Sequence, residues 1–278
     1  MIRFDNQVAV VTGSGRGLGE AYARLLAARG ARVVVHDAGV ALDGQGFDPA
    51  VAAAVVRKIT DAGGSAVPCS ENIETRAGCR RVIETALDHF GRLDILISNA
   101  GWVDRTPLEE ITPELLTRIL DIQIAAPLWL AQAALPTMKQ QRYGRVVLTS
   151  SGLGLWTEGA RPELSGYAIG KAAQIGLMNS LAANAAGADI HANIISPVAA
   201  TRIYTGRVAP GALRPEQVAP GVAFLASSFC KISGVIVRAG DGHFSTMHWQ
   251  VGPEVDFGAE AATPEDIAEK WEQLSAGF

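Results

Sequence analysis

Short runs of apolar residues, most of them β-branched, alternate along this chain with longer segments of helical periodicity. The runs contain no polar position: residues 8–11 read Val-Ala-Val-Val, residues 33–35 are three valines, and residues 95–97 read Ile-Leu-Ile. Strands with apolar side chains on both faces are typical of a parallel sheet that helices cover on both sides. The alternation therefore predicts an α/β fold, a Rossmann-like, doubly wound parallel sheet of seven strands with helices on both faces.

The same pattern predicts where each element lies. Strands are expected at residues 7–12, 32–36, 65–68, 94–98, 145–150, 190–195 and 234–238. Helices are expected at residues 17–29, 49–61, 75–90, 113–139, 165–186, 214–227 and 263–274. Because no repeat, low-complexity segment or linker divides the chain, we expect residues 1–240 to form one dinucleotide-binding and catalytic domain. Residues 241–278 are then a C-terminal extension packed on that domain.

Composition and charge exclude several classes of function. Of the 278 residues 19% are charged, the net charge is −4 and no basic stripe is present, so a nucleic-acid partner is not expected. The three cysteines have no Cys-x-x-Cys spacing and the five histidines no metal-ligand spacing, which predicts reduced thiols, a cytoplasmic protein and no bound metal. A strand begins by Val8, which leaves no room for a signal peptide. The longest apolar stretch, residues 122–136, is interrupted and too short to cross a membrane.

A glycine-rich turn joins the first expected strand to the first expected helix, with the spacing G-x-x-x-G-x-G. Glycine permits a positive φ, and its missing Cβ lets a diphosphate come close to the backbone. The following helix directs its free N–H groups and the positive end of its dipole at those phosphates. A glycine turn by itself can be merely a tight turn, but its place between strand and helix indicates a dinucleotide site. The expected contacts here are Gly13, Ser14, Arg16, Gly17, Leu18 and Gly19.

Asp37 ends the second expected strand, 18 residues beyond Gly19. A carboxylate there can accept hydrogen bonds from both hydroxyls of an adenosine ribose and would repel a 2′-phosphate, which favours NAD over NADP. The other interpretation is an ordinary turn aspartate. Arg16 instead favours NADP, because a guanidinium in the glycine turn can bind a 2′-phosphate. NAD is therefore the expected cofactor, and NADP stays open.

Tyr167 and Lys171 stand four residues apart on an expected helix, so the phenol and the ammonium share one face. A Tyr-x-x-x-Lys pair of this kind usually belongs to a solvated surface, and alone it carries little weight. Together with the glycine turn, however, it resembles the short-chain dehydrogenase/reductase family, whose own turn also reads G-x-x-x-G-x-G. The resemblance runs in order over about residues 5–240.

Further motifs carry this resemblance. Asn99-Ala100-Gly101 resembles the family's turn after strand four, which supports the sheet and lines the cofactor, and Ser151 matches the catalytic serine after strand five. Asn72-Ile73 resembles the family's Asp-Val pair beside the adenine, with Asn for Asp. Val198 stands where the family usually has glycine. The resemblance therefore implies further cofactor contacts at Asn72, Ile73, Asn99, Ala100, Gly101, Pro197, Val198 and Thr201.

The resemblance also implies a chemistry. Free tyrosine has a pKa near ~10, too high for a base at neutral pH. Lys171 and the positive nicotinamide would favour the phenolate of Tyr167, which then exchanges a proton with the substrate while hydride passes to or from the nicotinamide. Ser151 would hydrogen-bond the substrate oxygen. Lys171 and Tyr167 would also contact the cofactor.

Gln123 departs from the family, which often has an Asn there that feeds a proton relay through the lysine. Gln keeps the amide, but an ordinary core-edge glutamine is an equal interpretation. Ser151 and Tyr167 are 16 residues apart, where the usual gap is about 13, and Gly170 replaces a frequent Ser. The intervening residues are either a reshaped substrate mouth or a tolerated surface loop.

Several stretches are most similar to the (3R)-hydroxyacyl-CoA dehydrogenase unit of multifunctional β-oxidation enzymes, which includes 17β-hydroxysteroid activity. They include residues 33–39, the loop at residues 39–48 and residues 143–151. This resemblance implies a bulky apolar alcohol as the small-molecule substrate. The expected pocket walls are Trp102, Leu153, Trp156, Val198, Ile203 and Tyr204.

Two alternatives remain at this point. A non-catalytic NAD(H)-binding regulator or scaffold of the same fold competes with the enzyme, and Gln123 is the residue that hints at it. The helices at residues 113–139 and 165–186 resemble those through which family members form homodimers and homotetramers, and the sequence does not decide between these two assemblies.

Overall fold

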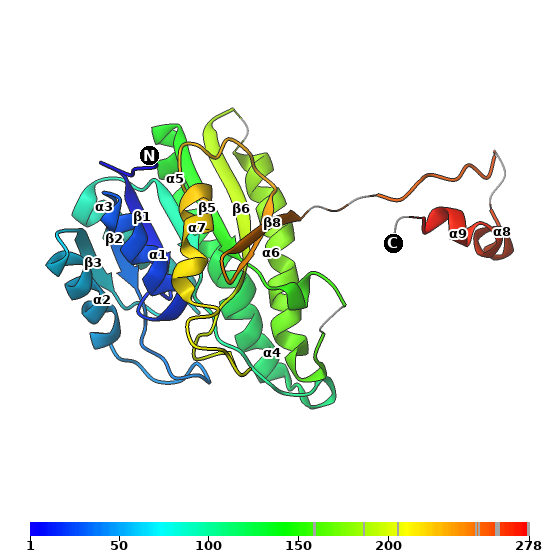
Figure 1. Cartoon of the computed structure of the whole chain (residues 1–278), viewed down its shortest axis with the longest axis horizontal. Coiled ribbons are helices and arrows are strands. Elements are labelled where there is room, and N and C mark those ends of the chain that lie inside the picture. Colours follow the sequence, from blue (N-terminus) through cyan, green and yellow to red (C-terminus); the bar gives the residue numbers. More distant parts are fainter. Residues whose placement is uncertain are drawn as a thin grey trace. The chain divides into compact units, whose positions relative to one another are not determined.

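The computed structural model describes residues 1–157, 160–185, 187–204, 206–247, 249, 251–258 and 262–276. The chain divides into two compact units, Met1–Thr246 and Met247–Phe278. The first unit contains the whole predicted alternation of strands and helices (Figure 1). The second contains two short helices, α8 (Pro264–Glu269) and α9 (Trp271–Leu274), and α8 begins where the hydroxyl of Thr263 accepts a hydrogen bond from the Asp266 N–H.

One eight-stranded sheet forms the centre of the first unit, in the order β3-β2-β1-β4-β5-β6-β7-β8. The pairs from β3 through β7 are all parallel, and the order reverses direction at β1, which confirms the doubly wound arrangement. The strands are β1 (Val8–Thr12), β2 (Arg32–His36), β3 (Ser65–Cys69), β4 (Ile95–Ser98), β5 (Tyr143–Thr149), β6 (Asp189–Val198), β7 (Ile236–Gly240) and β8 (His243–Met247).

The eighth strand is one more than the sequence pattern predicts. Only Asp241 and Gly242 separate β7 from β8, and both have positive φ, 50° and 77°, as a two-residue hairpin turn requires. The hairpin makes β8 an antiparallel edge strand. Its residues 243–246 are exposed, so it lacks the buried apolar run by which the other strands were predicted. The Asp-Gly pair was the signal that could have revealed it.

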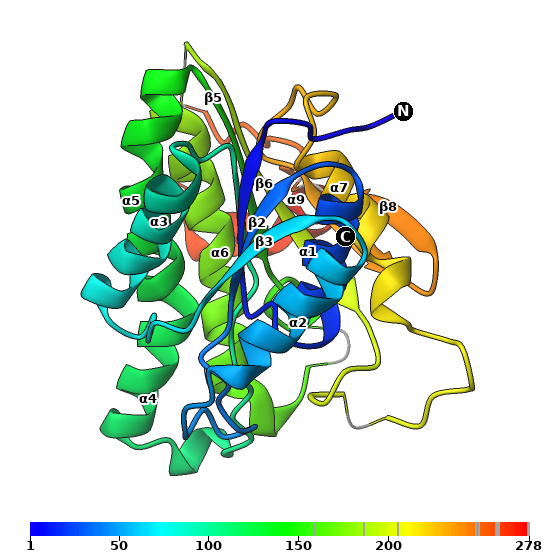
Figure 2. The ribbon, with the colours of Figure 1, turned by 90° about the vertical axis from the view of Figure 1, so that its left-hand side faces the viewer.

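Helices cover both faces of the sheet (Figure 2). The helices α1, α2 and α7 lie on one face, and α3, α4, α5 and α6 lie on the other. Apolar side chains of β1 and β2 pack with α1, α2 and α7 into a buried core. The bounds are α1 (Gly17–Ala28), α2 (Ala50–Asp61), α3 (Arg76–Phe90), α4 (Pro113–Leu120), α5 (Ala126–Gln141), α6 (Ser165–Asn184) and α7 (Ala219–Leu225).

The expected helix at residues 113–139 is continuous but not uniformly α-helical. A π-helical turn, Asp121–Ala125, separates α4 from α5. The whole stretch, Pro113–Gln141, is long and apolar enough to cross a membrane by length and composition alone. In the structure Leu130, Ala134 and Met138 of α5 are buried, and α5 contacts α3 and β5. One face of α5 is therefore packed into the protein core.

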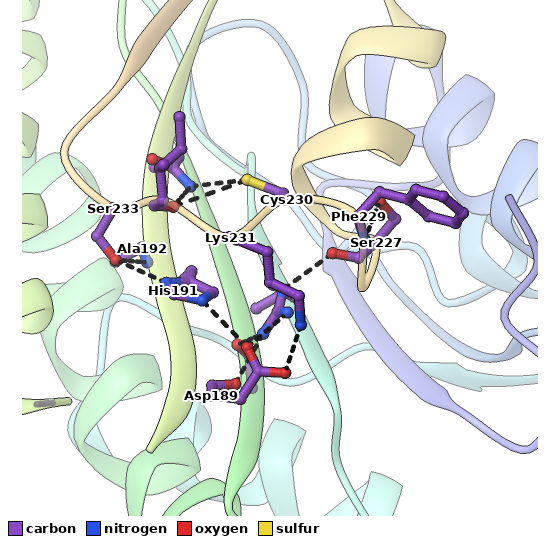
Figure 3. Close-up of polar contacts among 12 residues, drawn as sticks. Asp189, His191, Ala192, Ser227, Phe229, Cys230, Lys231 and Ser233 are labelled. Atoms are coloured by element: carbon purple, nitrogen blue, oxygen red, sulfur yellow. Dashed lines mark hydrogen bonds and ion pairs between the residues drawn. The ribbon is translucent and has the colours of Figure 1, made fainter. Parts of the chain in front are cut away.

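A polar network around the buried Arg145 lies at the amino ends of β5 and β6 (Figure 3). Arg145 is fully buried, yet its guanidinium donates to the Ser227 carbonyl (2.9 Å) and to both the carbonyl (2.7 Å) and the carboxylate (2.9 Å) of Asp189. The Asp189 carboxylate also pairs with Lys231 (3.1 Å) and contacts His191 (3.0 Å). A buried charge is tolerated only when it is paired in this way, so the network fastens β5, β6 and the segment after α7.

Candidate active site

A cavity of about 570 Å³ opens at the carboxyl ends of the parallel strands. Parallel sheets bind ligands at this edge, where the strand order reverses. Gly13, Asp37, Asn99, Ser151 and Pro197 come at or just after the ends of β1, β2, β4, β5 and β6. The cavity is lined by these predicted site residues: Gly13, Arg16, Gly17, Leu18, Gly19, Asp37, Asn72, Ile73, Asn99, Ala100, Gly101, Gln123, Ser151, Tyr167, Lys171, Pro197, Val198 and Thr201.

The glycine turn has the geometry that a phosphate site needs. Gly13 and Gly17 have φ values of +63° and +55°, and a Cβ on Gly13 would lie 2.8 Å from the Cα of Ala100. A Cβ on Gly19 would overlap the carbonyl oxygen of Gly13. Within the described residues, no side chain caps the first N–H groups of α1, which begins at Gly17. These free donors and the helix dipole fit the diphosphate of a dinucleotide.

Ser14 is the predicted cofactor contact that the structure places elsewhere. Its side chain is fully buried, and its hydroxyl donates to the Val11 carbonyl (2.7 Å) while its N–H donates to the His36 carbonyl (2.9 Å). It is not among the residues that line the cavity. Ser14 stays a predicted cofactor contact, and the structure shows its hydroxyl engaged inside the turn. Its role is to hold the turn against the end of β2.

Asp37 braces the same turn while it faces the cavity. One carboxylate oxygen accepts a hydrogen bond from the Gly15 N–H (2.9 Å) and the other from the Gly39 N–H (2.8 Å). Each oxygen retains a further lone pair for a ribose hydroxyl. At the neighbouring strand end, Asn72 turns its side-chain oxygen toward the Glu74 N–H (2.9 Å), and Ile73 is buried.

The Asn-Ala-Gly turn is fixed to the end of β1. The side chain of Asn99 donates to the carbonyls of Thr12 (3.0 Å) and Gly13 (3.2 Å). The Thr12 hydroxyl in turn accepts from the N–H groups of Asn99 (3.0 Å) and Ala100 (3.1 Å). These bonds cross the centre of the sheet, so Asn99 sets the position of the glycine turn.

Ser151, Tyr167 and Lys171 come together between the end of β5 and α6. The Lys171 ammonium donates to the Thr149 carbonyl (2.9 Å), and the Ser150 hydroxyl donates to the Lys171 carbonyl (2.7 Å). The ammonium lies 5.5 Å from the centroid of the Tyr167 ring. The helix face predicted from the Tyr-x-x-x-Lys spacing therefore points at the cavity, not at solvent.

Burial controls the acidity of both groups. Burial lowers the pKa of Lys171 from its ordinary 10.5 to about 8. Burial also raises the pKa of Tyr167, and a hydrogen bond with Ser151 opposes the rise. The chain alone thus moves the phenol in the direction opposite to the one expected from a neighbouring cation. A phenolate at neutral pH requires positive charge beyond what Lys171 supplies.

Gln123 lies in the π-helical turn, 2% exposed, between the Asn-Ala-Gly turn and α6. Its side-chain nitrogen donates to the Trp102 carbonyl (3.0 Å), and its own main-chain carbonyl accepts from the side chain of Gln174. Its side-chain oxygen has no partner among the described residues. Gly170 is small because a Cβ there would overlap the Cβ of Gln123. Sequence reasoning missed Gln174, since one glutamine in a long helix carries no signal.

The six expected apolar walls all line the cavity, from Trp102 to Tyr204. Three arginines that were not predicted there, Arg105, Arg161 and Arg202, line it as well. Each comes from a loop, where no periodicity shows which side chains face a cleft.

A family model described as short chain dehydrogenase matches residues 7–207, which include every cavity residue named above. The chain belongs to the short-chain dehydrogenase family. It is therefore an NAD(P)-dependent oxidoreductase. This short-chain dehydrogenase is 36% identical to the peroxisomal multifunctional enzyme type 2 of Mus musculus, over 98% of this chain and 37% of the mouse protein.

Two solved structures extend the comparison. A short chain dehydrogenase from Mycobacterium avium matches with a TM-score of 0.84 and 30% identity, over 98% of this chain and 95% of that one. A metagenomic short-chain oxidoreductase in complex with NADP matches with a TM-score of 0.70 and 30% identity, over 84% of this chain and 98% of that one. The chain spans 30–61% of the length of the curated multifunctional relatives that it matches.

Proposed function

We propose that this short-chain dehydrogenase interconverts a secondary alcohol and a ketone at a Ser151–Tyr167–Lys171 site. The observation that carries the proposal is that these three side chains and the glycine turn line one cavity. A dinucleotide on the turn and an alcohol beside Tyr167 would then share one enclosed space, as hydride transfer demands.

The residues of the cleft fit a nicotinamide dinucleotide. The turn from Gly13 to Gly19 would hold the diphosphate and Asp37 the adenosine ribose, with Asn72 and Ile73 beside the adenine. Pro197, Val198 and Thr201 would border the nicotinamide end, near Lys171 and the Asn-Ala-Gly turn. When bound, the nicotinamide accepts or supplies the hydride.

Proton transfer falls to Tyr167. Its hydroxyl would take the proton of the alcohol during oxidation and return it to the ketone oxygen during reduction. Ser151 would donate a hydrogen bond to the same oxygen and stabilise its developing charge. Lys171, whose pKa of about 8 leaves it mostly charged at neutral pH, lies near enough to stabilise the phenolate.

NAD is the proposed cofactor because Asp37 ends β2 and lines the cavity, where its charge would oppose a 2′-phosphate. Arg16 lines the same cavity, and the relative solved with NADP shows that the family accommodates that cofactor too. Titration of the protein with NADH and NADPH, read by cofactor fluorescence, separates the two. Tighter binding of NADPH would contradict the proposal.

The substrate is proposed to be a bulky apolar alcohol, a 3-hydroxyacyl-CoA or a steroid-like compound. Trp102, Leu153 and Trp156 give the cavity an apolar wall beside Tyr167, and the relatives of similar sequence are named multifunctional peroxisomal enzymes. Because the chain spans only part of those relatives, their other activities are not carried over.

The test is turnover of NAD, followed by NADH absorbance, on 3-hydroxyacyl-CoA, estradiol and small secondary alcohols. Preference for the first two substrates supports the proposal. Tight NADH binding with no turnover on any alcohol would instead favour the second candidate, a non-catalytic NAD(H)-binding regulator. This candidate is retained because the buried side-chain oxygen of Gln123 has no hydrogen-bond partner among the described residues.

Assembly and compartment complete the proposal. Leu128 of α5 and Ile169 of α6 are exposed apolar residues, 41% and 50%, on the helices expected to form a dimer or tetramer. Light scattering of the purified protein measures that state.

The three cysteines are free and buried, which supports a reducing compartment, and the cytoplasm is proposed. Residues 241–278 are proposed to pack on the domain.

A further inference from the structure

The segment after β6 forms part of the cavity wall. We call residues 199–204 the strap. At one point it touches the glycine turn, because a Cβ on Gly17 would lie 3.1 Å from Cγ2 of Thr201. Arg105 donates to the Ile203 carbonyl (3.4 Å) from the substrate side. The strap is therefore held over the cleft between the phosphate turn and the loop after β4.

Arg202 ties the strap to the nucleotide side. Its guanidinium donates to the Val40 carbonyl at 2.9 Å, across 162 residues of sequence. Arg16 of the glycine turn donates to the same carbonyl oxygen, at 3.5 Å. Two guanidinium groups thus converge on one oxygen atom at the wall of the cofactor cleft, and both line the cavity.

These two cations lack an anionic partner among the described residues. Neither guanidinium makes an ion pair within 4.0 Å there. Asp37 attracts Arg202 through its charge, but the two groups form no salt bridge within 4.0 Å. Burial and the charge of Arg16 together lower the pKa of Arg202. Like charges that converge without a direct ion pair favour the arrival of an anion.

We propose that Arg202 is a phosphate-binding residue, which acts with Arg16 on a phosphate group of the bound dinucleotide. A planar guanidinium suits this chemistry because it can donate two parallel hydrogen bonds to phosphate oxygens. The phosphate is either the diphosphate shared by NAD and NADP or the 2′-phosphate of NADP. The inference rests on the proposed dinucleotide site and adds to it a residue from the segment after β6.

The experiment compares Arg202→Gln with Arg207→Gln in direct binding of NADH and NADPH, read by cofactor fluorescence. Arg207 is a matched control because it is an exposed arginine of the same loop that does not line the cavity. We expect Arg202→Gln to weaken binding about tenfold and Arg207→Gln to leave it unchanged. Equal losses for both cofactors assign the diphosphate, and a loss for NADPH alone assigns the 2′-phosphate.

Unchanged affinity for both cofactors in Arg202→Gln would overturn the inference. If the wild-type protein bound neither cofactor, the proposed function itself would fail, so the two failures are distinguishable. Salt dependence separates phosphate binding from a merely structural tie to Val40. If Arg202 neutralises a phosphate, the dissociation constant of the wild type rises more steeply with salt than that of Arg202→Gln. Parallel salt dependence would show that Arg202 only holds the strap, and would overturn the inference.

Discussion

Arg145 and Lys171 are buried cations at opposite edges of the sheet, and they are paired differently. At the amino edge, Arg145 is fully buried but finds the carboxylate of Asp189 and several carbonyls, and Asp189 finds Lys231 as well. At the carboxyl edge, Lys171 is buried with one carbonyl partner, and the side-chain oxygen of Gln123 has none among the described residues.

The contrast shows where stability and function lie in this fold. A satisfied network fastens strands together and has little capacity left for a ligand. Groups without a protein partner are costly in the folded chain and regain interactions when a ligand arrives. The carboxyl edge is therefore the reactive edge. Single substitutions there should lower turnover, whereas substitutions at the amino edge should lower stability.

The largest expected effect is at the reactive edge. Tyr167→Phe removes the hydroxyl that carries the proton, so turnover on a preferred alcohol should fall about 10³-fold while NADH affinity stays within a few-fold of wild type. Tyr143→Phe, at the amino end of β5, is the matched control and should keep its turnover. Steady-state kinetics and NADH fluorescence measure the two quantities. Retained activity in Tyr167→Phe would show that Tyr167 is not the acid–base residue.

The next effect belongs to the amino edge. Arg145→Met leaves carbonyls and part of Asp189 without a donor, so the free energy of unfolding should fall by about 3–5 kcal/mol. Urea unfolding followed by circular dichroism measures the loss. Turnover per folded molecule should not change. If Arg145→Met instead lowered turnover without loss of stability, the division between the edges would be wrong.

Alkaline pH should increase the stability of the protein, because the buried Lys171 loses its charge there. Its pKa is about 8 in the folded chain against an ordinary 10.5, so between these values the unfolded chain holds a proton that the folded chain has lost. Stability therefore rises with pH in this window. Relative to Lys171→Met, the wild type should gain about 2 kcal/mol in unfolding free energy from pH 7.5 to 9.5. A constant difference between the two proteins would mean that Lys171 is not desolvated.

The smallest effect tests the packing behind the site. Gly170→Ala places a methyl group against the Cβ of Gln123 and should destabilise the fold by about 1 kcal/mol, after the gain in helix propensity is subtracted. Gly176→Ala lies on the same helix with open space around it and should stabilise by about 0.5–1 kcal/mol. Thermal unfolding of both variants measures the difference. Equal shifts would show that α6 and the π-helical turn are not in close contact.

The sequence revealed what local patterns encode. Apolar runs predicted the seven strands, the glycine spacing predicted the turn after β1, and the four-residue spacing placed Tyr167 and Lys171 on one face. The exposed strand β8 was missed because it has no apolar run. The inward direction of the Ser14 hydroxyl was not predicted, because spacing does not show whether a turn side chain points inward or outward.

Contacts between residues far apart in the sequence could not be predicted from local patterns. Arg202 meets Val40 across 162 residues, and Gln174 reaches the main chain of Gln123 in the π-helical turn across 51 residues. The rise in the pKa of Tyr167 depends on burial, which no motif reports. Each of these relations arises from how helices and loops pack on the sheet, not from the residues of any one segment.

A crystal structure of the protein with NAD tests the central claim most directly. The account predicts the diphosphate against the N–H groups of Gly17 and Leu18, and the nicotinamide ring beside the hydroxyl of Tyr167. A dinucleotide bound away from the carboxyl edge, or a Tyr167 hydroxyl turned from the nicotinamide into packed protein, would contradict it.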